Sequence, residues 1–276
     1  PAAIRPTPAN ALSQAEREAI LALCNRPEFA SLPPSQIVPR LADQQHRRGR
    51  SQPPQRRAAP TTHVATAARQ VWSWDITYLP SPVRGRYFYL YLIEDIYSRK
   101  AVGWEVYERE CGEQAATLLQ RTVLREGSLR QPLVLHSDNG APMKSTTLLS
   151  KMYELGITPS RGRPRVSNDN PYSESLFRTL KYCPQWPRDG FADVGAARAW
   201  VRDFVHWYNH EHRHSRIRFV TPAERHIGSD VEILAKRDTL YRQAQARNPA
   251  RWSRGTRNWM PAGAVTLNPE RVEMPL

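Results

Sequence analysis

Runs of apolar side chains in the middle of the chain predict five strands. Residues 71–78 alternate large apolar with small polar side chains, the period of a strand whose two faces differ. Residues 87–93 are almost wholly apolar, as in a strand that is covered on both faces. The three remaining runs are shorter and span residues 101–106, 132–137 and 157–160.

Apolar residues recur at helical spacing between and after these runs, which predicts an α/β fold. Thr221 is the predicted cap of one further helical turn. The longer predicted helices span residues 114–125, 145–155 and 196–211.

A helix that starts at Pro171 carries the most information. Asn170 is its predicted N-cap, and proline at the first helical position needs no hydrogen-bond partner. Its apolar side would hold Tyr172, Leu176 and Leu180. Its polar side would hold a carboxylate and two cations, Glu174, Arg178 and Lys181. Taken alone, this polar side also fits a solvated surface with a weak Glu–Arg pair.

The region before the strands divides into a helical part, residues 1–44, and a linker, residues 45–70. A capping box at Ser13 starts one helix, and a second helix is expected at Ser35. The pair looks like the start of a helix-turn-helix, but no third helix is predicted, so packing on the core or on a partner fits as well as DNA recognition. Prolines keep the linker extended. Its arginines, which would follow a phosphate backbone or be merely solvated, are Arg47, Arg48, Arg50, Arg56 and Arg57.

The charge balance points to a nucleic-acid partner. The 276 residues include 40 Lys and Arg against 26 Asp and Glu, a formal net charge of +14. No apolar run is long enough to span a membrane. The three cysteines are too far apart in sequence to form a zinc pair or a disulfide framework, which fits the cytoplasm.

Glu174 and two further acids form a pattern of three carboxylates along the chain. Asp75 and Asp138 are both predicted at strand ends, and 35 residues separate Asp138 from Glu174. A basic residue, Lys181, follows Glu174 by seven positions. With these residues, the chain from Val71 to Glu224 resembles the catalytic subunit of bacterial insertion-sequence transposases encoded in two overlapping reading frames. Their core is similar to that of retroviral integrases.

The resemblance implies an RNase H-like core, a mixed five-stranded sheet flanked by helices, over residues 71–230. It implies that Asp75, Asp138 and Glu174 are catalytic and bind Mg²⁺, with Mn²⁺ as a substitute and two ions in each site. The implied activity is cleavage and transfer of DNA strands at the ends of the element. The implied partners are double-stranded DNA, further copies of the chain, and an upstream-frame protein or fusion. The implied setting is the bacterial cytoplasm, at the nucleoid.

Other charged residues are given supporting roles. Glu94 and Asp95 are interpreted as structural, with Asp95 as the replacement if one of the three acids is not a ligand. Lys181 and Arg178 are expected to bind phosphates. A basic loop that leads to Glu174 is expected to lie against DNA through Arg161, Arg163 and Arg165. In the basic tail, residues 231–276, Trp252 and Trp259 would either stack on DNA or pack on the core.

Two other functions fit parts of this pattern. A metal-dependent nuclease on the same fold would cut DNA but not join it. A DNA-binding regulatory remnant would lack activity, which the missing third helix favours and the complete set of acids opposes.

Overall fold

The computed structural model describes residues 11–29, 32–33, 36–37, 40, 61–163 and 169–269. The chain divides into two compact units, Pro1–Arg56 and Arg57–Leu276, and each is described by itself. None of the helices within the described ranges is both long and apolar enough to cross a membrane.

The first unit contains helix α1 (Gln14–Cys24), which begins at the predicted capping box of Ser13 and Glu16. No residue of α1 is buried. Of the predicted second helix, Gln36, Ile37 and Arg40 are described and helical. The segment in which no third helix was predicted, and most of the arginine-rich linker, lie outside the described residues.

The second unit is built on a five-stranded sheet with the strand order β4-β3-β2-β5-β6. The strands β2, β3 and β4 pair antiparallel in chain order, whereas β5 pairs parallel with β2, and β6 pairs parallel with β5. The resemblance implied this architecture, a mixed five-stranded sheet flanked by helices. Its strands are β2 (Val71–Pro80), β3 (Tyr87–Asp95), β4 (Ala101–Tyr107), β5 (Leu133–Ser137) and β6 (Ile157–Arg161).

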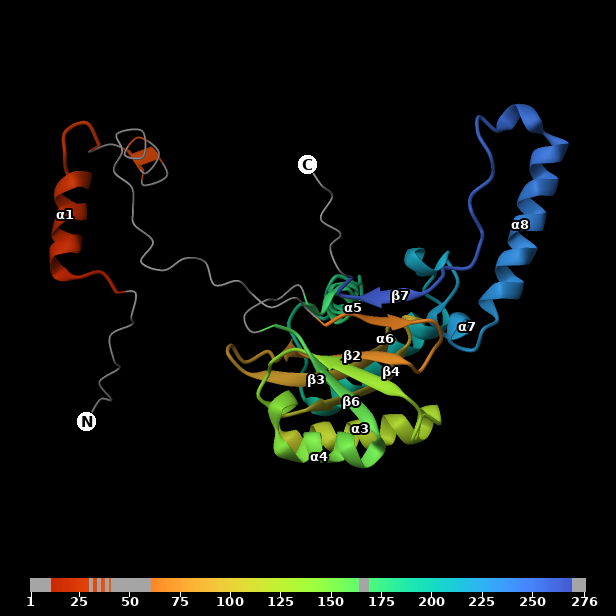
Figure 1. Cartoon of the computed structure of the whole chain (residues 1–276), viewed down its shortest axis with the longest axis horizontal. Helices are drawn as coiled ribbons and strands as arrows, with labels where there is room; N and C mark the ends of the chain where they lie inside the picture. The colour runs from red at the N-terminus through yellow and green to blue at the C-terminus, as the bar shows by residue number, and fades with distance from the viewer. Residues whose placement is uncertain are drawn as a thin grey trace. The chain divides into compact units, whose positions relative to one another are not determined.

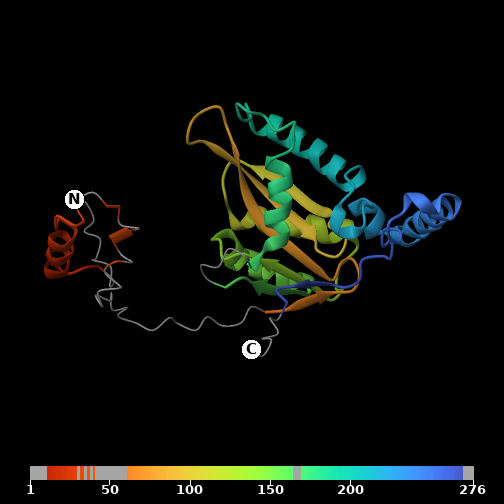
Figure 2. The same ribbon diagram turned by 90° about the horizontal axis from the view of Figure 1, so that it is seen from above.

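Helices cover both faces of the sheet (Figures 1 and 2). Trp72 and Trp74 pack on one face with the helices α3 (Gly112–Glu126) and α4 (Thr146–Leu155). The other face packs on α5 (Pro171–Lys181) and α6 (Val194–His210). Alternation along β2 therefore directs Ser73 and Asp75 toward the α5 side, because successive side chains point to opposite faces.

A small second sheet was not predicted. Strand β1 (His63–Ala65) pairs antiparallel with β7 (Val265–Leu267), so two segments expected to be linker and tail meet. The sheet packs near the start of α5, where the Tyr172 hydroxyl donates to the backbone carbonyl of Thr266 at 2.8 Å.

The C-terminal segment also contains an unpredicted helix, α8 (Asp230–Arg247), which extends away from the sheet in both views (Figures 1 and 2). Only two of its residues are buried, Asp230 and Leu234. Trp259, for which two roles had been considered, is 6% exposed and packs with the cluster around Leu234.

Arg225, in the short helix α7 (Pro222–His226), joins this segment to the core. Its buried guanidinium donates to the carbonyls of Tyr97 at 2.7 Å and Ala262 at 2.8 Å. It pairs with the buried carboxylate of Asp230 at 3.2 Å and lies over the Tyr97 ring. The Arg225 side chain thus links three segments: the turn after β3, helix α8, and the residues that precede β7.

We expect Arg225→Ala to lower the free energy of unfolding by about 3–5 kcal/mol, because Asp230 would be left as an unpaired buried charge. Urea unfolding of the full chain measures this loss. Arg225→Lys keeps the charge but not the planar fork and should recover only part of the loss. A loss below about 1 kcal/mol for the alanine variant, as for a surface ion pair, would contradict this role for Arg225.

Candidate active site

Asp75 and Asp138 lie next to each other in the register of two neighbouring strands. β2 and β5 pair in parallel up to Trp74 and Ser137, and each acid is the next residue along the chain. Neighbouring strands are about 4.8 Å apart, so the backbones of Asp75 and Asp138 lie side by side just beyond the paired residues. Asp138 does follow its strand, as predicted. Asp75 does not lie at a strand end, because β2 continues to Pro80 through its pairing with β3.

Helix α5 supplies the third acid. It buries Leu176 and Leu180 against the sheet side and leaves Glu174, Arg178 and Lys181 exposed, as the period of the sequence predicted. Lys181 lies about 10 Å from Glu174 along the helix axis, because each residue advances the helix by 1.5 Å.

Asn170 does not cap α5 with its side chain, which corrects the prediction. Its amide nitrogen donates to the carbonyl oxygen of Trp74 at 3.1 Å, and its amide oxygen accepts from the hydroxyl of Ser73. Ser73 also lies 2.6 Å from the hydroxyl of Ser173. All these side chains are buried, and they fix the start of α5 to the strand that carries Asp75.

The sequence contained a signal for this contact that was not used. Ser73 is a small polar residue on the same face of β2 as Asp75, two positions earlier, in a strand that is otherwise largely apolar. A buried polar side chain needs a hydrogen-bond partner. Which residue provides it is visible only in the folded protein.

The acids influence one another electrostatically. The pKa of Asp75 is raised to about 7, chiefly by burial and then by the negative charges of Asp138 and Glu174, whereas a hydrogen bond from the Ile76 backbone and the charge of Lys181 oppose the shift. Partial burial also raises the pKa of Glu174. A partly protonated acid is the response expected when carboxylates crowd together.

The donor set suits a hard divalent cation, because all three side chains offer carboxylate oxygens. Asp138 already orders one of its oxygens with the backbone N–H of Gly140 at 3.0 Å. In the described part of the chain, no three acidic, histidine or cysteine side chains are close enough together to hold a metal ion. The pairing of β2 with β5 leaves Asp75 and Asp138 beside each other, and the side chains of Asp138 and Glu174 are exposed.

The two acids that were interpreted as structural, Glu94 and Asp95, have different surroundings. Asp95 is buried and accepts hydrogen bonds from the backbone of Arg69 at 2.6 Å and of Ser98 at 2.8 Å. Glu94 is also buried, and burial raises its pKa to about 8, opposed by Arg99. Both therefore face the interior of the protein, which fits the structural role expected of them.

The predicted DNA-binding residues differ in their surroundings. Lys181 and Arg178 are exposed on α5. Arg161 is half-buried and points a guanidinium nitrogen at the Met143 carbonyl, 3.4 Å away. Arg163 pairs with the buried carboxylate of Asp169. The remaining predicted contacts, Arg47, Arg48, Arg50, Arg56, Arg57 and Arg165, lie outside the described residues.

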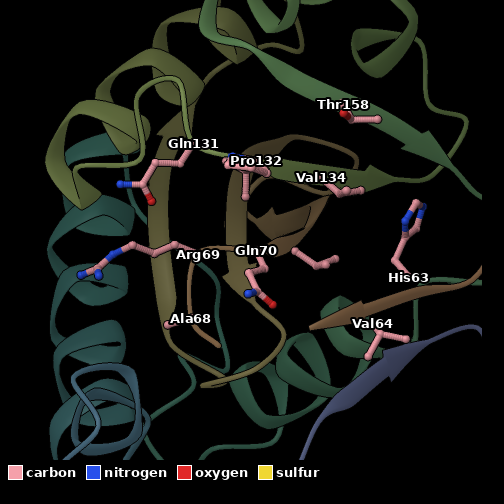
Figure 3. Close-up of a pocket in the computed structure, with 11 residues that line it drawn as sticks. His63, Val64, Ala68, Arg69, Gln70, Gln131, Pro132, Val134 and Thr158 are labelled. Atoms are coloured by element: carbon pink, nitrogen blue, oxygen red, sulfur yellow. The ribbon is translucent and has the colours of Figure 1, made fainter. Parts of the chain in front are cut away.

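A cavity of about 430 Å³ lies at the other end of the parallel strands (Figure 3). It is lined by Gln70 and Pro132, which precede β2 and β5, and by His63 of β1. None of the residues that line it is acidic. Asp75 and Asp138 therefore do not face this cavity, because they come after the paired residues of β2 and β5, whereas the cavity lies where these strands begin.

Comparison with known proteins places this arrangement in a family. Residues 65–167 and residues 155–222 match two sequence models, each described as an integrase core domain, and together they cover more than half of the chain. A transposase for the insertion sequence element IS904 of Lactococcus lactis is 32% identical over 118 residues, which are 42% of this chain and 45% of that protein. The transposase InsF for insertion sequence IS3A of Escherichia coli is 28% identical over 153 residues, 55% of this chain and 51% of the other.

Residues 65–222 belong to the integrase core family, and the two curated relatives named above are transposases of bacterial insertion sequences. It spans about half the length of the curated relatives that it matches. Among solved structures, a chain of the simian T-cell lymphotropic virus intasome in complex with PP2A regulatory subunit B56 gamma aligns with a TM-score of 0.47 at 15% identity, over 76% of this chain and 73% of that one.

Replacing Asn170 tests the contact between α5 and β2. We expect Asn170→Ala to lower the free energy of unfolding by about 1–3 kcal/mol, because the carbonyl of Trp74 would lose its partner in the interior. Urea unfolding measures this loss. Ser175→Ala, an exposed change on the same helix, is the matched control and should stay within about 0.5 kcal/mol of the wild type. Equal values for the two variants would rule out the contact as a stabilising one.

Proposed function

We propose that this protein is a DDE-type DNA transposase, a polynucleotidyl transferase that cuts the ends of an insertion sequence and joins them to target DNA. The observation that carries the proposal is the register of β2 and β5, which brings Asp75 and Asp138 together. The coupling of Asp75 to Glu174 and the names of the relatives support it.

Asp75, Asp138 and Glu174 are the proposed ligands of Mg²⁺, with Mn²⁺ as a substitute and two ions in each site. When bound, such ions stabilise the attacking and the leaving oxygen of an in-line phosphoryl transfer. The raised pKa of Asp75 supports this assignment, since it reflects a repulsion that divalent cations would relieve.

The proposed reaction has two steps. Water first forms a bond to phosphorus at the end of the element, and the bond from phosphorus to the 3′ oxygen breaks and leaves a 3′ hydroxyl. That 3′ oxygen then bonds to a phosphorus of the target strand, whose own 3′ oxygen leaves and takes up a proton. The second step exchanges one phosphodiester for another, so it needs no other energy source.

The exposed cations of α5 are the proposed phosphate contacts nearest to the acids. The positive charge of Lys181 lowers the pKa of Asp75, which fits a position beside the reacting DNA strand. The remaining proposed contacts are the arginines predicted from the sequence, Arg47, Arg48, Arg50, Arg56, Arg57, Arg161, Arg163 and Arg165. Three further exposed arginines, at and after the end of α8, are also proposed phosphate contacts: Arg247, Arg251 and Arg254. Assembly of several copies on DNA in the bacterial cytoplasm, with an upstream-frame partner, completes the proposal.

Glu174→Gln tests the acid assignment. We expect cleavage of a labelled duplex that carries the element's end to fall by more than about 100-fold, beyond the loss typical of residues that only support a metal ligand. DNA affinity, measured by fluorescence anisotropy, should stay nearly unchanged. Glu154→Gln, an exposed change on α4, is the matched control and should cut normally. Cleavage near the wild-type rate in Glu174→Gln would refute the assignment.

Lys181→Ala tests the phosphate contact and separates a transposase from a nuclease. We expect weaker strand joining, and a slope of log affinity against log salt that is reduced by about 0.9, because one phosphate contact is lost. Lys151→Ala on α4, where the lysine pairs with Glu154, should change neither value. A wild-type protein that cuts the labelled end but never joins it to target DNA is a nuclease.

If the Lys181→Ala variant shows unchanged strand joining and an unchanged salt slope, Lys181 has only a structural role.

A further inference from the structure

His136 connects the strand of one acid to the segment that precedes the helix of another. It is fully buried in β5, two positions before Asp138 and on the same face of the strand. Its Nε2 lies 3.0 Å from the carbonyl oxygen of Asp169, just before α5. Its Nδ1 lies 2.9 Å from the hydroxyl of Ser160 in β6.

The direction of these hydrogen bonds follows from the chemistry of the partners. A carbonyl oxygen only accepts, so Nε2 of His136 carries the proton and donates to Asp169. In the neutral ring Nδ1 then accepts from the Ser160 hydroxyl. That hydroxyl can in turn accept from Nε2 of His63, which is 2.9 Å away in β1. The chain of bonds therefore runs through β1, β6 and β5 to the start of α5, and each group has a single defined role.

Asp169 is held from its other side as well. Its buried carboxylate accepts from the backbone N–H of Arg163 at 2.6 Å and from two guanidinium nitrogens of Arg163 at 3.0 and 2.9 Å. Arg163 follows β6, so this contact joins the two ends of the segment between β6 and α5. Asp169 thus contacts β5 through its carbonyl and the end of β6 through its side chain.

We propose that His136 and Asp169 are positioning residues that set the place of Glu174 relative to Asp138. The inference rests on the proposed function of the three acids. Asn170 already fixes the start of α5 to β2 through Ser73, two positions before Asp75. The bond from His136 to Asp169 fixes the same turn to β5. The two attachments hold this turn against two strands, and they add to the burial of Leu176 and Leu180 farther along the helix.

A purely structural histidine would make a different prediction. If His136 only fills the core, any polar replacement of similar size should have the same effect. If its Nε2 bond to Asp169 is what matters, the effect should depend on which nitrogen is replaced. The amide nitrogen of glutamine reaches approximately the place of Nε2, and that of asparagine approximately the place of Nδ1. Both replacements are uncharged, so their costs of burial are similar.

The experiment compares His136→Gln with His136→Asn in the full chain. In His136→Asn, we expect cleavage at subsaturating Mg²⁺ to fall by about 10- to 100-fold, the loss typical when a residue that orients a metal ligand is removed. His136→Gln should keep most of the activity. Ser160→Ala, which leaves the bond to Asp169 in place, should behave like His136→Gln.

A second measurement does not depend on activity. Amide hydrogen exchange in peptides that cover residues 169–176 should be at least about 10-fold faster in His136→Asn than in His136→Gln, because the first turn of α5 opens more easily. Peptides of α3 should exchange alike in both. The melting temperatures should also agree, so that a general loss of stability is excluded.

The outcomes separate the two proposals. Equal activity and equal exchange in the two His136 variants would overturn the positioning role, whatever the reaction is. Suppose that amide exchange at the start of α5 is faster only in His136→Asn, and that Glu174→Gln still cleaves DNA. The attachment of α5 would then stand, but the assignment of the acids would be refuted. Faster exchange in His136→Asn with equal cleavage in the two His136 variants would also overturn the positioning role, because the attachment of α5 would then not affect the acids.

Discussion

The parallel pairing of β2 with β5 is the contact on which the arrangement of the acids depends. Four residues of each strand pair in register, and the pairing stops where Asp75 and Asp138 follow. Past that point β2 continues with β3 as its partner, so the sheet keeps Asp75 fixed while the chain after Asp138 turns away. A shift of the register by one residue would turn one acid to the opposite face of the sheet.

Bringing carboxylates together has an electrostatic cost, which the folded protein must offset. Charge repulsion and burial both act on Asp75, and its raised pKa records their combined effect. Hydrogen bonds between uncharged groups hold the surrounding backbone in place: Asn170 and Ser73 on the β2 side, and His136 on the β5 side. These contacts are buried and satisfied, so they can resist the repulsion without adding further charge to the site.

Most of the core was predictable because its elements have strong local periods. The five strands of the large sheet and the helices on its faces lie close to their predicted positions, and the exposed side of α5 holds the residues expected there. The elements that were missed lack such a period. β1 and β7 have three residues each and pair across most of the chain, and α8 has no clear apolar stripe. Asn170 was assigned to a local cap, but two buried groups of β2 compete successfully for its side chain.

The strands and helices of the core, the strongly basic charge, and the spacing of Asp75, Asp138 and Glu174 can all be read from the amino-acid sequence. These features are local or additive, so they can be recognised without knowing which segments meet. The packing of Trp259 in the interior, the pairing of Arg163 with Asp169, and the bond from His136 to the segment before α5 follow only from the folded structure. Each of these contacts depends on how strands and helices pack, and the side chains involved have alternative partners of similar strength until packing selects one.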